Sequence, residues 1–284
     1  MSDAPNQNGN FNPAHEAHSI EQVLFVVQFG RPLTDEELLK VRQSTSVFKV
    51  SKELPATTEL QGFTINMGMG APMPVQNGFM LYRTGPDGTV EKELRIERNS
   101  VTFRTTHYSR WENIWNEAKK YFETIIPLFS TNNKATGISL NVFDKFIWSG
   151  AIEKCSAEAL LSRESKYLCP YLFENKDLWH SHTGAFIRVD DQTKRLININ
   201  IDSLDEIQGN NPCRVVVIAT VLTDLLNQPG YTPYDLEEIN SMAEIESKFQ
   251  ELHIYGNGVF GNIINYDISK RNRSDPYQKK LKQH

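Results

Sequence analysis

The sequence predicts an α+β fold in which antiparallel sheet is covered by long amphipathic helices. Segments rich in β-branched and aromatic residues come first in each half of the chain, and a segment with helical spacing of apolar residues follows them. This order differs from the strand–helix alternation of a doubly wound parallel sheet. Because it occurs in residues 19–150 and again in residues 151–270, we take as a hypothesis a duplicated unit of three strands and a helix.

Composition and charge limit the class of protein. A chain of 284 residues with 39% hydrophobic residues can bury a large core without further support. The formal net charge of -5 gives no overall positive field, so nucleic-acid binding by the whole chain is not expected. Cys155, Cys169 and Cys213 form no CxxC pair and are expected to be small buried side chains in a reducing compartment. No segment predicts a membrane span or a signal peptide, so we expect a cytoplasmic protein.

Both ends of the chain are expected to be flexible. Residues 1–18 contain one large apolar side chain, Phe11, which cannot offset the entropy lost on ordering, so this tail is expected to be disordered. His15 and His18 share the segment in an HxxH spacing, and any metal binding there is expected to be incidental. Residues 271–284 are basic and are expected to be a solvated tail, with non-specific nucleic-acid contact as the alternative.

In the first half, local signals mark a strand, a short helix and a hairpin. The apolar run 20–29 predicts a buried strand, and Thr34 with Glu37 forms a capping box at the start of a short helix. The sequence Gly-Pro-Asp-Gly at 85–88 predicts a turn that joins the strands on either side of it into an antiparallel hairpin. The strands expected after the short helix are 62–67, 78–83 and 92–106.

A strongly amphipathic helix is expected over residues 108–128. A capping box of Ser109 and Glu112 precedes apolar residues that recur at three- and four-residue steps. Trp111 and Trp115 lie one turn apart on this apolar face, and we expect both in the core. The alternative is an exposed aromatic anchor for a partner protein.

The second half repeats this order of elements. Residues 153–175 are expected to be hydrophilic helix or loop, and turn residues at 190–193 separate two strands. A final helix is expected over 235–270, with Ser241 and Glu244 as a capping box within it. The strands expected around these elements are 137–148, 185–189, 195–201 and 214–222.

The final helix contains Gly256, Gly258 and Gly261 in the spacing GxGxxG. In dinucleotide-binding folds a strand leads into such glycines and a βαβ unit continues beyond them. Here apolar residues at helical steps precede the glycines and too few residues follow, so no nucleotide or other cofactor is expected. We expect Gly256 to permit a close contact with the core, and Gly258 and Gly261 to kink or break the helix.

Four segments carry a resemblance to a known family. They are LRIERNSVTFR, YSRWENIWNEAKKYFETIIPLF, ISLNVFDKFIW and EIESKFQELHIYGNGVFGNIINYDI. In this order, over residues 20–270, the chain resembles a sporadically distributed family of uncharacterised prokaryotic proteins. The resemblance implies a prokaryotic cytosolic protein encoded among mobile or defence-related genes, and it implies no activity. The residues that match the family pattern are Tyr108, Trp111, Asp144, Lys145, Phe146, His253, Asn257 and Phe260.

His180 and His182, in Trp-His-Ser-His, are the candidates for a metal site. Alternate side chains of an extended segment share a face, so both imidazoles could meet one ion. A third ligand would have to come from Asp177 or Glu174. Two histidines without a further signature are more often surface residues of a loop or sheet, and we therefore expect no metal.

Asp144 and His253 are the candidates for catalysis. Asp144 could act with Lys145 and Asp202 as acid and base in a cleft, and His253 would face the sheet from the final helix. Alternation along the strand places Asp144 among apolar residues, where a charge needs a partner. A structural hydrogen bond or ion pair with the final helix is therefore the preferred interpretation of Asp144.

The sequence contains no Gly-x-Ser-x-Gly, HExxH, P-loop or kinase motif. We therefore expect a non-enzymatic interaction or regulatory protein whose partner is another protein or a second copy of this chain. Two alternatives stay open. One is a small-molecule- or metal-dependent enzyme with its site between the sheet and the final helix, and the other is nucleic-acid contact through the basic tail.

Overall fold

The computed structural model describes residues 9–64, 73–129, 134–175, 177–208, 211–226 and 241–265. The basic tail at 271–284, where nucleic-acid contact was the alternative, lies outside these ranges. Within them, no helix combines the length and the apolar character needed to cross a membrane.

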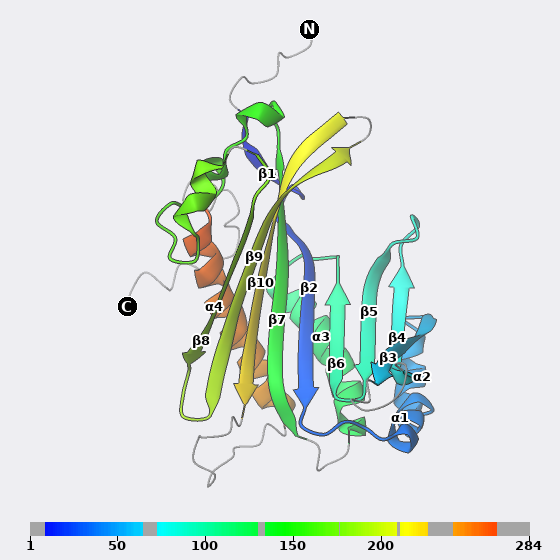
Figure 1. Ribbon diagram of the computed structural model, residues 1–284. Helices are drawn as coiled ribbons and strands as arrows, with labels where there is room; N and C mark the ends of the chain where they lie inside the picture. Colours follow the sequence, from blue (N-terminus) through cyan, green and yellow to red (C-terminus); the bar gives the residue numbers. More distant parts are fainter. Residues whose placement is uncertain are drawn as a thin grey trace.

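The described strands form one antiparallel sheet, which confirms the predicted α+β fold (Figure 1). In order across the sheet the strands are β3 (Ala56–Thr64), β4 (Met73–Thr84), β5 (Val90–Glu97), β6 (Ser100–Thr105), β2 (Ile20–Phe29), β7 (Ala135–Trp148), β10 (Asn211–Leu226), β9 (Thr193–Gln208) and β8 (His180–Arg188). A short strand, β1 (Phe11–Pro13), also pairs with β7. The two edges of the sheet are therefore β3 and β8.

Helices lie against one face of the sheet (Figure 1). We call the opposite face the distal face. The helices are α1 (Asp35–Arg42), α2 (Thr45–Ser51), α3 (Trp111–Ile125) and α4 (Met242–Ile263), with 3-10 turns η1 (Ile126–Leu128), η2 (Ile152–Lys154), η3 (Ala157–Ala159) and η4 (Pro170–Glu174). The segment expected as hydrophilic helix or loop thus contains short 3-10 turns.

The core lies between the sheet and the two longest helices, and Phe25 of β2 lies at its centre. The Phe25 ring is fully buried and contacts the rings of Trp111, Trp115 and Phe249. Both indole NH groups donate hydrogen bonds to α4. Trp111 donates to Gln250 at 2.7 Å, and Trp115 donates to Glu246 at 2.9 Å. Both tryptophans are 5% exposed, so their placement in the core is confirmed and neither is an exposed anchor.

Local signals located several elements correctly. Strand β2 has the predicted bounds, and the turn Gly-Pro-Asp-Gly joins β4 to β5, with Gly88 at a φ of 82°. The capping boxes of Thr34 with Glu37 and of Ser241 with Glu244 both form, because each pair of side chains satisfies backbone NH groups in the first turn of its helix.

The capping box predicted at the start of α3 is wrong. Arg110 is the N-cap of this helix and makes no side-chain capping bond. The helix therefore begins one residue later than a cap at Ser109 requires, and Glu112 occupies the second helical position instead of the third. Ser109 instead accepts a hydrogen bond from the side-chain amide of Asn113 at 3.2 Å.

The expected single strand over 92–106 is two strands, β5 and β6, joined by a turn at Arg98 and Asn99. Hydrogen bonds from a distant segment hold this turn. The guanidinium of Arg98 donates to the carbonyl of Leu33 at 2.8 Å, and the backbone NH of Phe29 donates to the carbonyl of Asn99 at 2.8 Å. No local pattern in the run indicated this contact.

The prediction of a disordered segment up to residue 18 is wrong for its described part, residues 9–18. Strand β1 pairs with the end of β7, and Phe11 is 2% exposed with its ring centroid 5.1 Å from that of Trp148. One aromatic side chain is enough here because a preformed strand end supplies both hydrogen bonds and an indole to pack on.

Helix α4 runs without a break through Gly256, Gly258 and Gly261, so the expected kink or break is wrong. The helix ends at Ile263 and not at residue 270, because Ile264 adopts extended backbone and forms a bridge with Leu161. The expected start at 235 lies outside the described residues.

The cysteines depart in part from the expectation that all are buried. All three are free thiols, and Cys169 is exposed while Cys155 and Cys213 are partly buried. Cys169 caps the short turn η4 at the surface, where no core packs against it.

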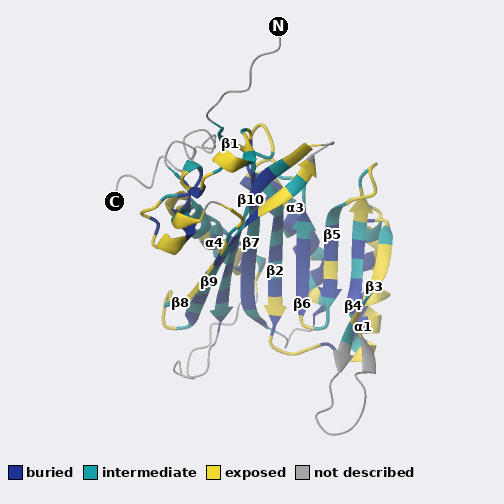
Figure 2. Cartoon of the chain, turned by 45° about the horizontal axis from the view of Figure 1, so that its top comes forward, coloured by how far each residue is buried: buried dark blue, intermediate teal, exposed yellow. Residues whose placement is uncertain are grey.

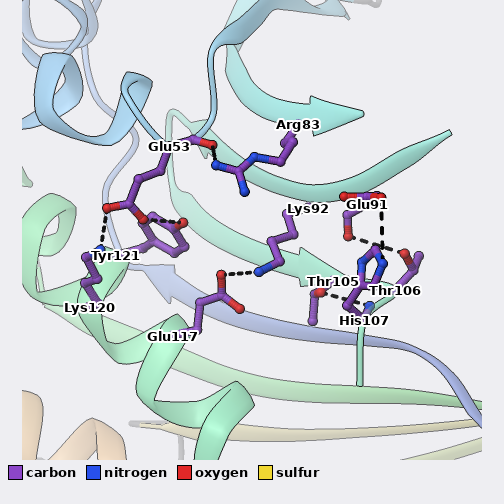
Figure 3. A network of polar contacts seen from close by, with 10 residues as sticks. All are labelled: Glu53, Arg83, Glu91, Lys92, Thr105, Thr106, His107, Glu117, Lys120 and Tyr121. Atoms are coloured by element: carbon purple, nitrogen blue, oxygen red, sulfur yellow. Dashed lines mark hydrogen bonds and ion pairs between the residues drawn. The ribbon is translucent and has the colours of Figure 1, made fainter. Parts of the chain in front are cut away.

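A polar network attaches α2 and α3 to the strands on the β3 side of the sheet (Figure 3). Glu53, just after α2, accepts hydrogen bonds from Lys120 and, at 3.1 Å, from the Tyr121 hydroxyl. Lys92 of β5 and Glu117 of α3 form an ion pair at 2.6 Å. Burial, followed by the charge of Glu53, raises the pKa of Tyr121, so its hydroxyl stays protonated and acts as a donor.

Candidate functional site

Asp144 is buried on the helix-covered face of β7. Its carboxylate accepts a hydrogen bond of 2.7 Å from the Ser19 hydroxyl, just before β2. Burial raises the pKa of Asp144 to about 7, and the hydrogen bond from Ser19 opposes this rise. The expected structural bond therefore exists, but its partner is the N-terminal segment and not the final helix.

The other members of the supposed acid–base group lie elsewhere. Lys145 follows Asp144 in the strand and so points to the distal face, where it pairs with Glu206 at 2.9 Å. Asp202 of β9 also lies on the distal face and contacts His180. The sheet thus separates the Asp144 carboxyl from both groups, and they do not form one site.

His253 lies in the contact between α3 and α4. Its ring stacks on Trp111 with centroids 3.9 Å apart and planes 4° apart, and its Nε2 is 3.1 Å from the amide nitrogen of Asn257. One turn away, a Cβ added at Gly256 would meet Leu222 at 3.3 Å, which is the close core contact expected there. His253 and Gly256 therefore pack α4 against its neighbours.

The N-terminal segment carries the two histidines in the HxxH spacing. Their ring centroids are 4.9 Å apart, and the Nε2 of His18 is 3.1 Å from the carbonyl oxygen of Tyr108. Burial and the nearby His15 lower the pKa of His18, which favours the neutral form of this ring. It contributes a hydrogen bond between the N-terminal segment and the start of α3.

The two histidines proposed as a metal pair lie on edge strand β8. Their ring centroids are 6.5 Å apart, and each ring is bound to β9: His180 to Asp202 at 2.6 Å and His182 to Asn198 at 2.7 Å. Asp177, one of the expected third ligands, lies 3.6 Å from the guanidinium of Arg214. In the part of the chain that the structure describes, no three His, Cys, Asp or Glu side chains are grouped to hold a metal ion.

The backbone of β8 presents hydrogen-bonding groups away from the sheet. At one end the carbonyl of Trp179 accepts from Ser203, and at the other end the NH of Val189 donates to Thr193, so the odd-numbered residues face β9. In an antiparallel ladder the alternate residues point the other way. The residues whose NH and C=O groups face outward are therefore His180, His182, Gly184, Phe186 and Arg188.

All five of these residues are exposed, and we call them the β8 edge (Figure 2). Phe186 is 58% exposed, with Lys194 5.5 Å from its ring centroid, and nearby Leu178 is 46% exposed. Among the described strands β8 pairs with β9 alone. The edge therefore combines available backbone groups with an exposed aromatic ring.

The sequence placed this strand at 185–189 and so missed its first half. The alternation in Trp-His-Ser-His-Thr-Gly-Ala-Phe-Ile was the available signal, because the two histidines and Phe186 fall on one face of a single strand. The glycine inside the run obscured it.

Comparison with known proteins gives no match, either to a protein-family model or to a curated protein.

Proposed function

We propose that this protein is a non-enzymatic interaction protein that binds an extended polypeptide segment as an additional strand along the β8 edge. The observation that carries the proposal is the set of outward-facing backbone groups on five exposed residues of β8. In strand addition, main-chain hydrogen bonds supply affinity and alternate side chains supply specificity. Phe186 supplies an aromatic contact for such a segment.

The other edge of the sheet differs in a way that supports this choice. Strand β3 carries Glu59 near its centre, where it pairs with Arg42 and accepts from Gln76. Proteins commonly protect edge strands from pairing with charged side chains. The β8 edge carries its charged residue, Arg188, at one end, so the stretch from His180 to Phe186 lacks that protection.

The proposal includes the duplicated unit. In the first half β2 leads through α1 and α2 into strands β3 to β6 and then α3. In the second half β7 leads through η2 to η4 into β8 to β10 and then α4. In each half the last strand before the helix pairs with the first strand, so that β6, β5 and β4 correspond to β10, β9 and β8, and β3 is an additional strand of the first half. The resemblance to prokaryotic proteins adds a prokaryotic cytosol, with defence or mobile-element genes as neighbours, to this proposal.

A peptide selection with a matched pair of variants tests the strand-binding function. Gly184→Pro removes an outward NH from the edge, whereas Gly184→Ala keeps that NH. The alanine side chain fits, because its Cβ would meet only the carbonyl oxygen of Ile197 at an ordinary 3.8 Å. Displayed extended peptides of nine random residues are selected on wild-type protein at nanomolar concentration. We expect selected peptides to bind Gly184→Ala within a few-fold and to lose ten-fold or more on Gly184→Pro. Equal binding to both variants would count against the proposal, as would a selection without enrichment.

A further inference from the structure

We infer that the strand which occupies the β8 edge is β8 of a second copy of this chain, so that two sheets join across a two-fold axis. This inference rests on the proposed function of the edge and names its partner. An isologous contact of this kind requires the same surface on both copies to be complementary to itself. The register, the central glycine and the charges of β8 each meet this requirement.

The register is symmetric about Gly184, the middle residue of the strand from His180 to Arg188. Antiparallel pairing with Gly184 opposite its own copy places His182 opposite Phe186 and His180 opposite Arg188. All of these residues present their NH and C=O groups outward, so every outward group of both strands is hydrogen-bonded in this register. If one β8 strand were shifted by one residue against the other, these residues would lie opposite residues whose NH and C=O groups already bond β9.

Gly184 has no explanation within one copy. Glycine weakens the interior of a strand, and a Cβ at this position would meet only ordinary contact with the carbonyl of Ile197. A glycine within a strand often marks the close approach of another backbone. At the two-fold axis two glycines face each other, with a cross-strand pair of His182 and Phe186 on either side.

Charge on the distal face is also complementary in this register. The His180 end of the edge carries the carboxylate of Asp202, whereas the other end carries Arg188 and Lys194. Antiparallel pairing brings the basic end of one copy beside Asp202 of the other, twice. Arg188 in one copy pairs with the solvent-exposed Asp191 in an i,i+3 pair, which it can exchange at little cost, and it also donates a hydrogen bond of 3.3 Å to the backbone carbonyl of Asp190.

A single engineered cysteine tests the register. In the inferred dimer two Gly184→Cys residues face each other with Cα atoms about 5.5 Å apart, within the range of a disulfide. Ala185→Cys is the matched control, because Ala185 is also exposed but lies one residue away from the axis on each strand. The Cα atoms of the two Ala185 residues are therefore about 8 Å apart, beyond the range of a disulfide. Both variants carry Cys169→Ser to remove the exposed native thiol.

We expect mild oxidation to convert most of Gly184→Cys to a covalent dimer that dithiothreitol reverses, and to leave Ala185→Cys monomeric on a denaturing gel. Equal cross-linking of both variants, or none of Gly184→Cys, would overturn the register and with it the inference. Sedimentation of uncross-linked protein gives the second measurement. We expect wild-type protein to form dimers and Phe186→Lys to raise their dissociation constant ten-fold or more. Because this side chain is exposed, circular dichroism should show that the variant is folded.

The two proposals fail separately. Wild-type protein that stays monomeric at 100-fold the selection concentration, yet binds selected peptides through the β8 edge, overturns the second copy as partner and leaves strand binding in place. A dimer that is unchanged by both Gly184→Pro and Phe186→Lys overturns the inference, because the contact then lies elsewhere. Peptide binding that dissociates the dimer supports both proposals.

Discussion

Asp144 is a carboxyl group in the core whose hydrogen bond comes from Ser19, 125 residues earlier in the chain. Burial disfavours the charged form of this carboxyl, which is why its pKa rises to about 7. The bond also fixes the point at which the N-terminal segment enters β2. A residue that resembled a catalytic acid in the sequence thus has a structural role in the fold.

Asp144 should make the stability of the protein depend on pH in one direction. The folded protein keeps this proton up to about pH 7, whereas the unfolded chain releases it near pH 3.8. The stabilising contribution is therefore complete below pH 3.8, falls as the pH rises towards 7 and is constant above it. We expect Asp144→Asn, which is neutral at every pH, to flatten this fall. Urea unfolding at pH 5, 6 and 7.5 measures it.

The control for that measurement is Glu153→Gln at the exposed turn η2, which should keep the wild-type slope. A slope that is the same in wild type and in Asp144→Asn would show that the buried carboxyl is not the group responsible.

Two glycines of α4 should respond differently to alanine. A Cβ at Gly258 meets nothing within 4 Å, so Gly258→Ala should raise the free energy of unfolding by about 1 kcal/mol through helix propensity alone. At Gly256 the new methyl would press on Leu222 at 3.3 Å, and the gain should be smaller or absent. Thermal and urea unfolding measure the free energy of unfolding of the two variants and of the wild type. A larger gain for Gly256→Ala than for Gly258→Ala would contradict the close contact.

Among the single elements, β1 and α4 form although their local composition disfavours them, because tertiary contacts stabilise both. Strand β1 continues the line of β2 along β7, and residues 15–18 leave the sheet between them. Helix α4 tolerates three glycines because its apolar face packs on β7, β10 and α3, and most helical stability in proteins comes from such packing.

The ordered β1 predicts a large effect of a single substitution near the N-terminus. Phe11→Ala should lower the free energy of unfolding by about 3 kcal/mol or more, since it leaves a cavity beside Trp148. The matched control is Phe48→Ala in α2, whose side chain is 65% exposed and whose loss should cost well under 1 kcal/mol by ordinary surface standards. Equal effects of the two substitutions would mean that β1 does not pack as the structure shows.

At the scale of the whole molecule, the two halves share one sheet and one core. Strand β2 of the first half pairs with β7 from Ile20 to Phe29, and β7 in turn pairs with β10 along most of its length. Phe25 lies beneath both α3 and α4, so neither long helix has a core of its own.

This shared core predicts a single unfolding transition. Urea unfolding followed by tryptophan fluorescence, which reports on Trp111 and Trp115 together with Trp148 and Trp179, should coincide with unfolding followed by far-ultraviolet circular dichroism. Two separated transitions would show instead that the halves are independent folding units.

Features that depend on neighbours along the chain could be predicted from local residue patterns. The apolar run of β2, the Gly-Pro-Asp-Gly turn and the capping boxes at Thr34 and Ser241 are encoded within a few residues, and each forms as predicted. Periodicity likewise placed Trp111 and Trp115 in the core, because an amphipathic helix has one buried face.

Features that depend on residues far apart in the chain became visible only in the folded protein. The strand at Phe11 needs Trp148, the turn at Asn99 needs Phe29, and the partner of Asp144 is Ser19. Likewise, nothing near His180 and His182 in the sequence showed that their strand is the edge of the sheet, since that position depends on the pairing of all the other strands. Local patterns specify period and capping, whereas burial and edge position are properties of the assembled sheet.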